Sequence, residues 1–168
     1  RCFKLSKFPF KMSPDVFISY SREDQQQVVK MVEYLRGQGI SVWMDETDIH
    51  GATIWTKEIV EAIRASSLFI LAISGHSTGS KNVVKELALA SEREKIILPI
   101  YLEQCDIPET MEYQLAGIQR VEYFEGNEDE SIGGVLRALK RLGISTDGDT
   151  PTQALGQAPT SKPQTKAK

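Results

Sequence analysis

The sequence predicts an α/β fold of the flavodoxin-like kind. This is a three-layer sandwich in which a five-stranded parallel sheet of order 2-1-3-4-5 carries helices on both faces. Five short runs of apolar, often β-branched residues alternate with five segments of helical periodicity, an alternation typical of parallel sheets. Residues 67–74 (SLFILAIS) are apolar almost throughout, as expected of a central strand buried on both faces.

The strands are predicted from runs of β-branched and aromatic residues that turn residues interrupt. In chain order they are residues 16–20, 40–44, 67–74, 96–102 and 119–123. Pro99 interrupts the fourth run. Because proline donates no ladder hydrogen bond, we expect a bulge or an edge-like position there. The fifth run is more polar than the others and is expected at an edge of the sheet.

The helices are predicted from apolar residues spaced three or four apart. Asp24 is the expected N-cap of a first helix of about 14 residues, which Gly37 and Gly39 end. The later helices are expected around residues 54–63, 82–93, 108–116 and 131–142. Polar loops, residues 46–53 and 75–80, follow the second and third strands.

The two ends of the chain differ from its middle. Residues 1–12 carry four Lys or Arg and no acid, and we interpret them as an upstream or appended basic segment, with a weak membrane anchor as the alternative. Residues 145–168 are rich in Thr, Gln, Pro, Gly and Lys and predict a disordered tail or linker. A single domain over residues 13–144 is therefore expected.

Composition excludes several classes of function. Residues 13–144 hold 13 basic and 21 acidic residues, a net charge of −8, which argues against a nucleic-acid binder. No apolar run approaches the roughly 20 residues of a membrane span. Cys2 and Cys105 are too few for a disulfide framework, so we expect a cytoplasmic protein.

Ligands of such folds bind beyond the carboxyl ends of the strands, so the loops there decide the chemistry. After the first strand come Tyr20, Ser21 and Arg22, and Asp45 closes the second. A Mg²⁺-dependent receiver needs an acidic pair directly after the first strand, where this chain has Tyr20, Ser21 and Arg22 instead. Glycine-rich dinucleotide and phosphate loops and a Cys/His zinc cluster are also absent from the sequence.

Glu86 is the one carboxylate with suggestive placement, about one turn into the helix that follows the central strand. A carboxylate there can hydrogen-bond ribose hydroxyls or stabilise an oxocarbenium ion, as in glycoside cleavage. The alternative is a structural glutamate favoured by the helix dipole or paired with Lys85. Spacing alone favours the structural role.

The chain resembles a TIR (Toll/interleukin-receptor) domain of the type common in bacteria. Five segments match the family in order and spacing over about residues 14–143. They are residues 15–21 (DVFISYS), 39–45 (GISVWMD), 49–51 (IHG) with Trp55, 65–74 (ASSLFILAIS) and 80–86 (SKNVVKE). Any one segment is a weak signal, whereas five in the correct order are a strong one.

The resemblance implies cleavage of the nicotinamide–ribose bond of NAD+, which is a substrate rather than a cofactor. The products would be nicotinamide and ADP-ribose or a cyclic isomer, in signalling or defence. Glu86 falls on the position of the family's catalytic glutamate, which reverses the preference stated above. Asp45 matches an acidic position beside the family's nucleotide site; an Asx turn is its alternative role. No metal is implied.

One departure from the family pattern concerns Asn82, because active members often carry Trp there. An aromatic platform would then come from Trp43, Trp55 or Tyr20, although packing is the favoured role of both tryptophans. Arg22 could pair with a substrate phosphate.

The family's BB loop implies partners, since it contacts neighbouring TIR domains in catalytic assemblies. Ile49, His50 and Gly51 would then serve self-association, as a homo-oligomer or filament, and substrate access. Two alternatives stay open: a catalytically silent TIR–TIR interaction module, which Asn82 favours, and a nucleotide-sensing domain without turnover.

Overall fold

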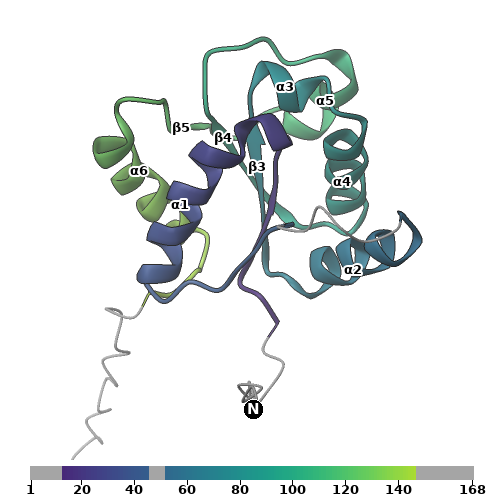
Figure 1. Cartoon of the computed structure of the whole chain (residues 1–168), viewed down its shortest axis with the longest axis horizontal. Coiled ribbons are helices and arrows are strands. Elements are labelled where there is room, and N and C mark those ends of the chain that lie inside the picture. Colours follow the sequence, from purple (N-terminus) through teal and green to yellow (C-terminus); the bar gives the residue numbers. More distant parts are fainter. Residues whose placement is uncertain (1–12, 46–51, 147–168) are drawn as a thin grey trace, which may run out of the picture.

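A computed structural model describes residues 13–45 and 52–146, with side chains described from residue 57 onward in the second range. Helices flank a central sheet on two sides (Figure 1). The strands are β1 (Val16–Ser19), β2 (Val42–Trp43), β3 (Leu68–Ile73), β4 (Ile96–Tyr101) and β5 (Val121–Glu122). The helices are η1 (Arg22–Asp24), α1 (Gln25–Gly37), α2 (Ala52–Ala65), α3 (Gly75–Thr78), α4 (Lys81–Glu92), α5 (Glu109–Leu115) and α6 (Glu128–Arg141).

The sheet has the predicted order, β2-β1-β3-β4-β5, and all of its pairings are parallel. β3 is the centre, with all six residues buried, and it pairs with β1 on one side and β4 on the other. β2 and β5 are shorter than predicted, two residues each, and form the edges. Parallel pairing brings the carboxyl ends of β1, β2 and β3 to one edge of the sheet, where the candidate site residues follow.

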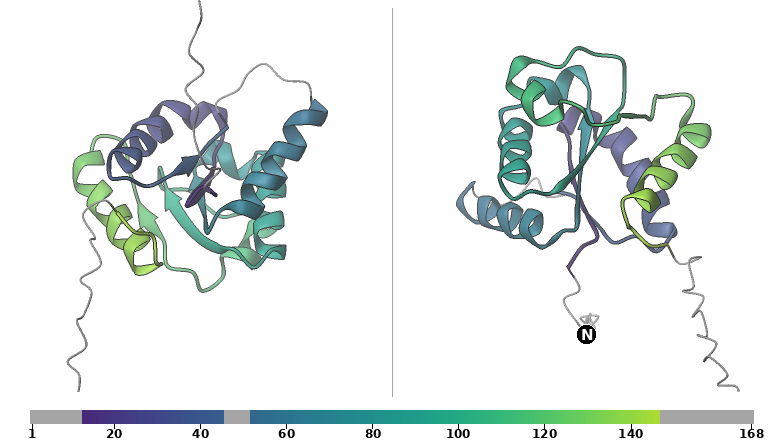
Figure 2. Two further views of the ribbon diagram at one scale, coloured as in Figure 1. Left: turned by 90° about the horizontal axis from the view of Figure 1, so that it is seen from below. Right: turned by 180° about the vertical axis from the view of Figure 1, so that it is seen from behind.

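Two apolar cores lie on the two faces of the sheet. On one face α1 and α6 pack against Val16, Ile18 and Ile70, and on the other face α2, α4 and α5 pack against Phe17 and Phe69. Figure 2 shows the same division, with α1 and α6 together on one side. The first helix follows its predicted period, because its four buried residues are Val28, Met31, Val32 and Leu35.

The expected bulge at Pro99 does not form. The register between β3 and β4 runs without interruption from Leu68↔Ile96 to Ile73↔Tyr101. Tyr101 O accepts a hydrogen bond from Tyr123 N, so Pro99, two residues earlier, also faces the β5 side. Pairing with β5 begins only at Ile100, so no ladder donor is needed at Pro99 and its position is edge-like on that side.

Two further segments differ from the prediction. Residues 75–78, expected in a loop, form α3 because the Ser74 side chain accepts hydrogen bonds from the backbone N–H groups of His76 and Ser77 in a capping box. The last helix begins at Glu128 rather than residue 131, and three acids in its first turn favour that start through the helix dipole.

Asp24 occupies the N-cap position of α1, as predicted, but its side chain does not cap the helix. Its carboxylate accepts a hydrogen bond from Ser74 Oγ at 2.5 Å instead, which ties η1 to α3. Among the described helices, none combines the length and the apolar content needed to cross a membrane.

Candidate active site

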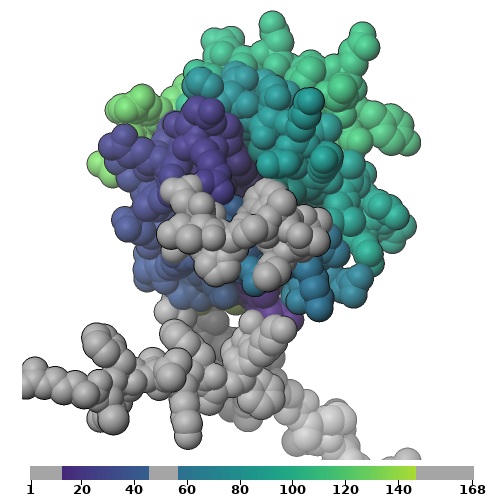
Figure 3. Space-filling view, turned by 45° about the vertical axis from the view of Figure 1, so that its right-hand side comes forward, coloured from purple at the N-terminus to yellow at the C-terminus, as the bar shows by residue number. Residues whose placement is uncertain are grey.

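A cleft of about 200 Å³ opens beyond the carboxyl ends of β1 and β2, beside the start of α4. In the space-filling view the chain around the end of β1 lies next to the teal residues of α3 and α4 (Figure 3). The residues that line the cleft are Phe17, Ile18, Tyr20, Ser21, Arg22, Glu23, Trp43, Asp45, Ser80, Asn82 and Glu86.

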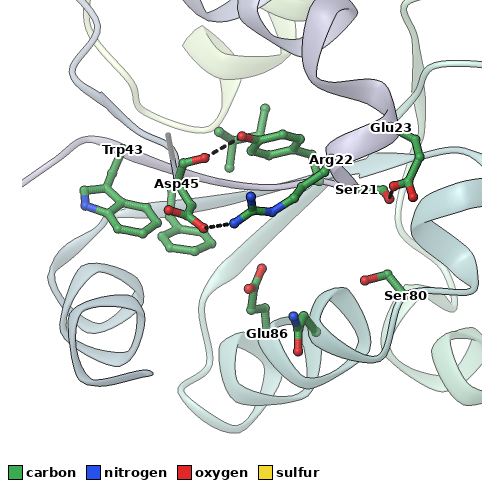
Figure 4. Close-up of a pocket in the computed structure, with 11 residues that line it drawn as sticks. Ser21, Arg22, Glu23, Trp43, Asp45, Ser80 and Glu86 are labelled. Carbon is green, nitrogen blue, oxygen red and sulfur yellow. Dashed lines mark hydrogen bonds and ion pairs between the residues drawn. The ribbon is translucent and has the colours of Figure 1, made fainter. Parts of the chain in front are cut away.

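Glu86 reaches this cleft from α4. The Ser80 hydroxyl caps the helix by accepting a hydrogen bond from Val83 N at 3.4 Å, so the helix begins at Lys81 and Glu86 is its sixth residue. Figure 4 shows the Glu86 side chain pointing from the helix toward the Arg22–Asp45 pair. Its Oε2 accepts a hydrogen bond of 2.6 Å from the hydroxyl of Ser19, the last residue of β1.

The surroundings of Glu86 raise the pKa of its carboxyl group to about 7, from an ordinary 4.5. Desolvation by the surrounding protein is the largest cause, and the negative charge of Asp45 adds to it. The hydrogen bond from Ser19 opposes both, because it stabilises the carboxylate. Perturbed carboxyl groups of this kind concentrate at functional sites.

Asp45 joins the ends of β1 and β2 through two contacts. Tyr20 Oη donates a hydrogen bond of 2.5 Å to the Asp45 carbonyl oxygen, and Arg22 Nη2 lies 3.7 Å from Asp45 Oδ2. The Arg22 side chain is 56% exposed, so its ion pair with Asp45 stabilises the fold only weakly. An exposed guanidinium at the rim can therefore change partners at little cost.

Trp43 contributes both to the core and to the cleft. Its ring stacks on Phe17 with centroids 4.8 Å apart and planes 12° apart, and Phe17 stacks in turn on Phe69 at 5.4 Å. Packing was the favoured role from sequence, and the stack confirms it. The indole also lines the cleft, where it offers an aromatic wall.

Ser21 and Glu23 form the remaining wall on the η1 side. The buried Ser21 hydroxyl donates a hydrogen bond to the Glu23 carboxylate, and this bond is the main reason that the pKa of Glu23 falls below its ordinary value. Asn82 is exposed at the opposite rim, one turn before Glu86 on α4. The cleft thus combines carboxylates, hydroxyls and one guanidinium around an aromatic wall.

Seven of the residues named as candidates from sequence meet in this cleft: Tyr20, Ser21, Arg22, Trp43, Asp45, Asn82 and Glu86. Ile49, His50 and Gly51 lie outside the described residues. Trp55 falls within α2, but its side chain is also outside the described part. Within residues 13–45 and 52–146, no three His, Cys, Asp or Glu side chains gather as metal ligands.

Sequence reasoning missed Glu23 and Ser80 as cleft residues, and it missed Ser19 as the hydrogen-bond partner of Glu86. Ser19 is the most important of these residues, because it is 1% exposed and its hydroxyl donates a hydrogen bond to Glu86. A polar residue at the buried end of an apolar strand was the available signal. Its partner, 67 positions later, becomes visible only in the fold.

Comparison with known proteins gives one family. A family model described as TIR domain matches residues 16–136. A search of curated proteins finds no match to the sequence.

Solved structures with the same fold come from varied sources. The TIR domain of the Toll-related receptor TRR-2 from Hydra magnipapillata aligns with a TM-score of 0.62 and 22% identity, over 76% of this chain and 98% of that one. The TIR domains of the activated Roq1 resistosome align at 0.59 and 19%, over 76% and 99%. The CMP N-glycosidase BcmB from Clostridium botulinum aligns at 0.57 and 18%, over 74% and 98%.

Proposed function

This chain belongs to the TIR domain family, and from that premise we propose that it cleaves the nicotinamide–ribose bond of NAD+. The products are nicotinamide and either ADP-ribose or a cyclic ADP-ribose isomer, formed in signalling or defence. The observation that carries the proposal is Glu86, whose carboxyl group lies in the cleft, accepts a hydrogen bond from Ser19 and has a pKa that desolvation raises to about 7.

The proposed reaction needs one carboxylate beside the ribose. The bond between ribose C1′ and the nicotinamide nitrogen breaks, and its electron pair leaves with that nitrogen, which neutralises the pyridinium. Positive charge then develops at C1′, where the Glu86 carboxylate stabilises it and accepts hydrogen bonds from ribose hydroxyls. Water attacks C1′ and loses a proton to give ADP-ribose, or a nitrogen of the substrate's own adenine attacks to give the cyclic product.

The electrostatics of the cleft suit the cationic nicotinamide ring of NAD+. Glu23, Asp45 and Glu86 place three carboxyl groups in the cleft against one arginine. The positive nicotinamide ring favours the ionised form of Glu86, so binding of NAD+ lowers the pKa that desolvation has raised. The substrate thereby converts the glutamate to the form that the reaction needs.

The size of the cleft indicates which part of NAD+ enters it. Its volume of about 200 Å³ is below the roughly 300–1,000 Å³ of pockets that enclose whole drug-sized ligands. We expect the nicotinamide riboside half to lie inside, against Trp43 and Tyr20, and the phosphates to reach Arg22 at the rim. Ile49, His50 and Gly51 of this or a neighbouring TIR domain would complete the site in a homo-oligomer or filament.

Nicotinamide release from NAD+ by concentrated protein tests the proposal. Glu86→Gln keeps the shape of the side chain and removes its charge, so it should reduce release at least about a hundredfold. Glu92→Gln is the matched control, because Glu92 is an exposed glutamate on the same helix, outside the cleft. If Glu86→Gln is as active as wild type, the assignment is wrong.

Two other outcomes are informative because specific observations point to them. One structural neighbour is a CMP N-glycosidase, so release of cytosine from CMP should be measured alongside. Asn82 is exposed where an aromatic residue was expected, which favours a catalytically silent TIR–TIR interaction module. If assembled protein cleaves neither nucleotide, that interaction role replaces the enzymatic one.

A further inference from the structure

A second groove lies at the opposite end of the sheet, between α6 and the amino ends of β4 and β5. Ile97 and Leu98 of β4 line it together with Val121 of β5. Its volume is about 380 Å³, within the roughly 300–1,000 Å³ range of small-molecule sites. The cleavage of NAD+ proposed above makes no use of it.

Three arginines surround this apolar lining. Arg137 and Arg141 are four positions apart on α6 and therefore project from one face of the helix. Arg120 lies across the groove, where its guanidinium stacks 4.9 Å from the Tyr101 ring centre and pairs with Glu122 at 3.1 Å. In the part of the chain that the structure describes, Arg137 and Arg141 make no hydrogen bond or ion pair.

This concentration of positive charge stands out in an acidic domain. Residues 13–144 have a net charge of −8, yet three of their seven arginines line this one groove. None of the described residues that line it carries a carboxylate. The groove therefore complements an anion, whereas the surrounding surface repels one.

Two glycines lie in the interior of α6, and one of them, Gly134, lines the groove. Glycine is a poorer helix former than alanine, so Gly133 and Gly134 weaken this helix. A larger residue would fit at position 134 without a clash. A Cβ there would lie 3.8 Å from Val121 Cγ1 and 3.9 Å from Arg137 Nη2, which are ordinary contact distances. A methyl group at position 134 would fit the fold and partly fill the groove.

We propose that this groove binds a small phosphorylated molecule with a flat, weakly polar body, of the size of a nucleoside monophosphate. Arg137 and Arg141 take the phosphate oxygens through paired N–H donors, a geometry that guanidinium groups match well. The flat body lies against Ile97 and Val121, in the space that the absent side chain of Gly134 leaves open. The site is separate from the NAD+ cleft and independent of its chemistry.

Titration of the full isotope-labelled chain with AMP, followed by amide chemical shifts, tests this proposal. AMP should give saturable shifts at Val121, Gly134 and Ala138, and adenosine and inorganic phosphate should each bind at least tenfold more weakly. The double variant Arg137→Gln/Arg141→Gln should lose at least tenfold in AMP affinity at these residues. Arg93→Gln, an exposed arginine at the end of α4, is the matched control and should bind normally.

A second variant tests whether binding depends on the open space of the groove and not on its positive charge alone. Gly134→Ala should raise the melting temperature, because it favours the helix, and should weaken AMP binding at least tenfold, because it fills the groove. Gly37→Ala in α1 should leave binding unchanged, since nothing lies within 4 Å of a Cβ there. Glu86→Gln should also leave the shifts around Gly134 unchanged, which distinguishes the groove from the cleft.

Several results would overturn the proposal. AMP shifts confined to Tyr20, Asn82 and Glu86 would assign binding to the cleft alone. Absence of saturable shifts at millimolar AMP, wild-type affinity in the double variant, or equal affinity for phosphate and AMP would each reject the groove as a nucleotide-sized site.

Discussion

At the carboxyl ends of the strands the cleft is lined by Glu23, Asp45 and Glu86, whereas at the amino ends the groove beside α6 is lined by three arginines. The polar groups of the cleft contact one another closely, as Ser19 does with Glu86 and Tyr20 with Asp45. In the groove, two of the three guanidinium groups make no hydrogen bond or ion pair with described residues. These differences are the basis of the two proposals, a preorganised site for a developing cation at one end of the sheet and an open site for an anion at the other.

The largest expected effect concerns the pH dependence of the cleft. If ionised Glu86 is required, kcat/KM for NAD+ should fall about tenfold per pH unit below about 7, the pKa that desolvation sets. The profile of kcat should bend at lower pH, because bound NAD+ favours the carboxylate. A profile of kcat/KM that is flat between pH 5 and 8 would show that the charge of Glu86 is not used.

The next effect is on stability. The pKa of Glu86 is about 7 in the fold against 4.5 ordinarily, so the folded protein holds this proton more tightly and loses stability as pH rises from about 4.5 to 7. Glu86→Gln carries no such penalty and should be about 2 kcal/mol more stable than wild type at pH 8, after allowance for partial exposure, and similar to it at pH 4. Urea denaturation at both pH values measures this difference.

Removing the partner of Glu86 should have a somewhat smaller effect. Ser19→Ala deletes the hydrogen bond that stabilises the carboxylate, so the acidic limb of kcat/KM should move to higher pH and activity at pH 7 should drop about tenfold. Ser66→Ala is the control, because Ser66 is another serine 1% exposed whose hydroxyl bonds to Ile63 O, away from the cleft. If the acidic limb of the kcat/KM profile of Ser19→Ala lies at the same pH as in wild type, Ser19 has no positioning role.

The smallest expected effect comes from replacing one exposed arginine at the cleft and one at the groove. Arg22 pairs with Asp45 at the cleft, and Arg120 pairs with Glu122 at the groove. Replacing either by Gln should change the free energy of unfolding by less than about 1 kcal/mol, as is usual for exposed ion pairs. Only Arg22→Gln should raise KM for NAD+ severalfold in steady-state assays; an equal rise in Arg120→Gln would remove the functional distinction between the ends.

Sequence patterns predicted the layers of this molecule better than its contacts. The apolar run of β3 and the period of α1 depend on local alternation, which determines what each element buries. The strand order was predicted from the alternation of five strands with five helices and from the size of the chain. The short lengths of β2 and β5 could not be predicted in this way, because an edge strand ends where its one neighbour stops pairing with it.

The environment of Glu86 could not be predicted from the sequence, for a physical reason. Its pKa depends on burial and on two partners, Ser19 and Asp45, that are distant along the chain. In the groove, the spacing of Arg137 and Arg141 and the glycine pair before them are visible in the sequence. Arg120 and the apolar lining join them only when β4, β5 and α6 come together.

The stack of Trp43 on Phe17 makes the cleft accessible to spectroscopy. The chain has two tryptophans, so replacement of Trp55 by Phe leaves Trp43 as the sole indole emitter. Because this ring lines the cleft, a nicotinamide ring placed against it would quench its fluorescence, and a stopped-flow trace would then time substrate entry separately from bond cleavage. The residue that links the core to the cleft therefore doubles as a built-in optical probe of occupancy.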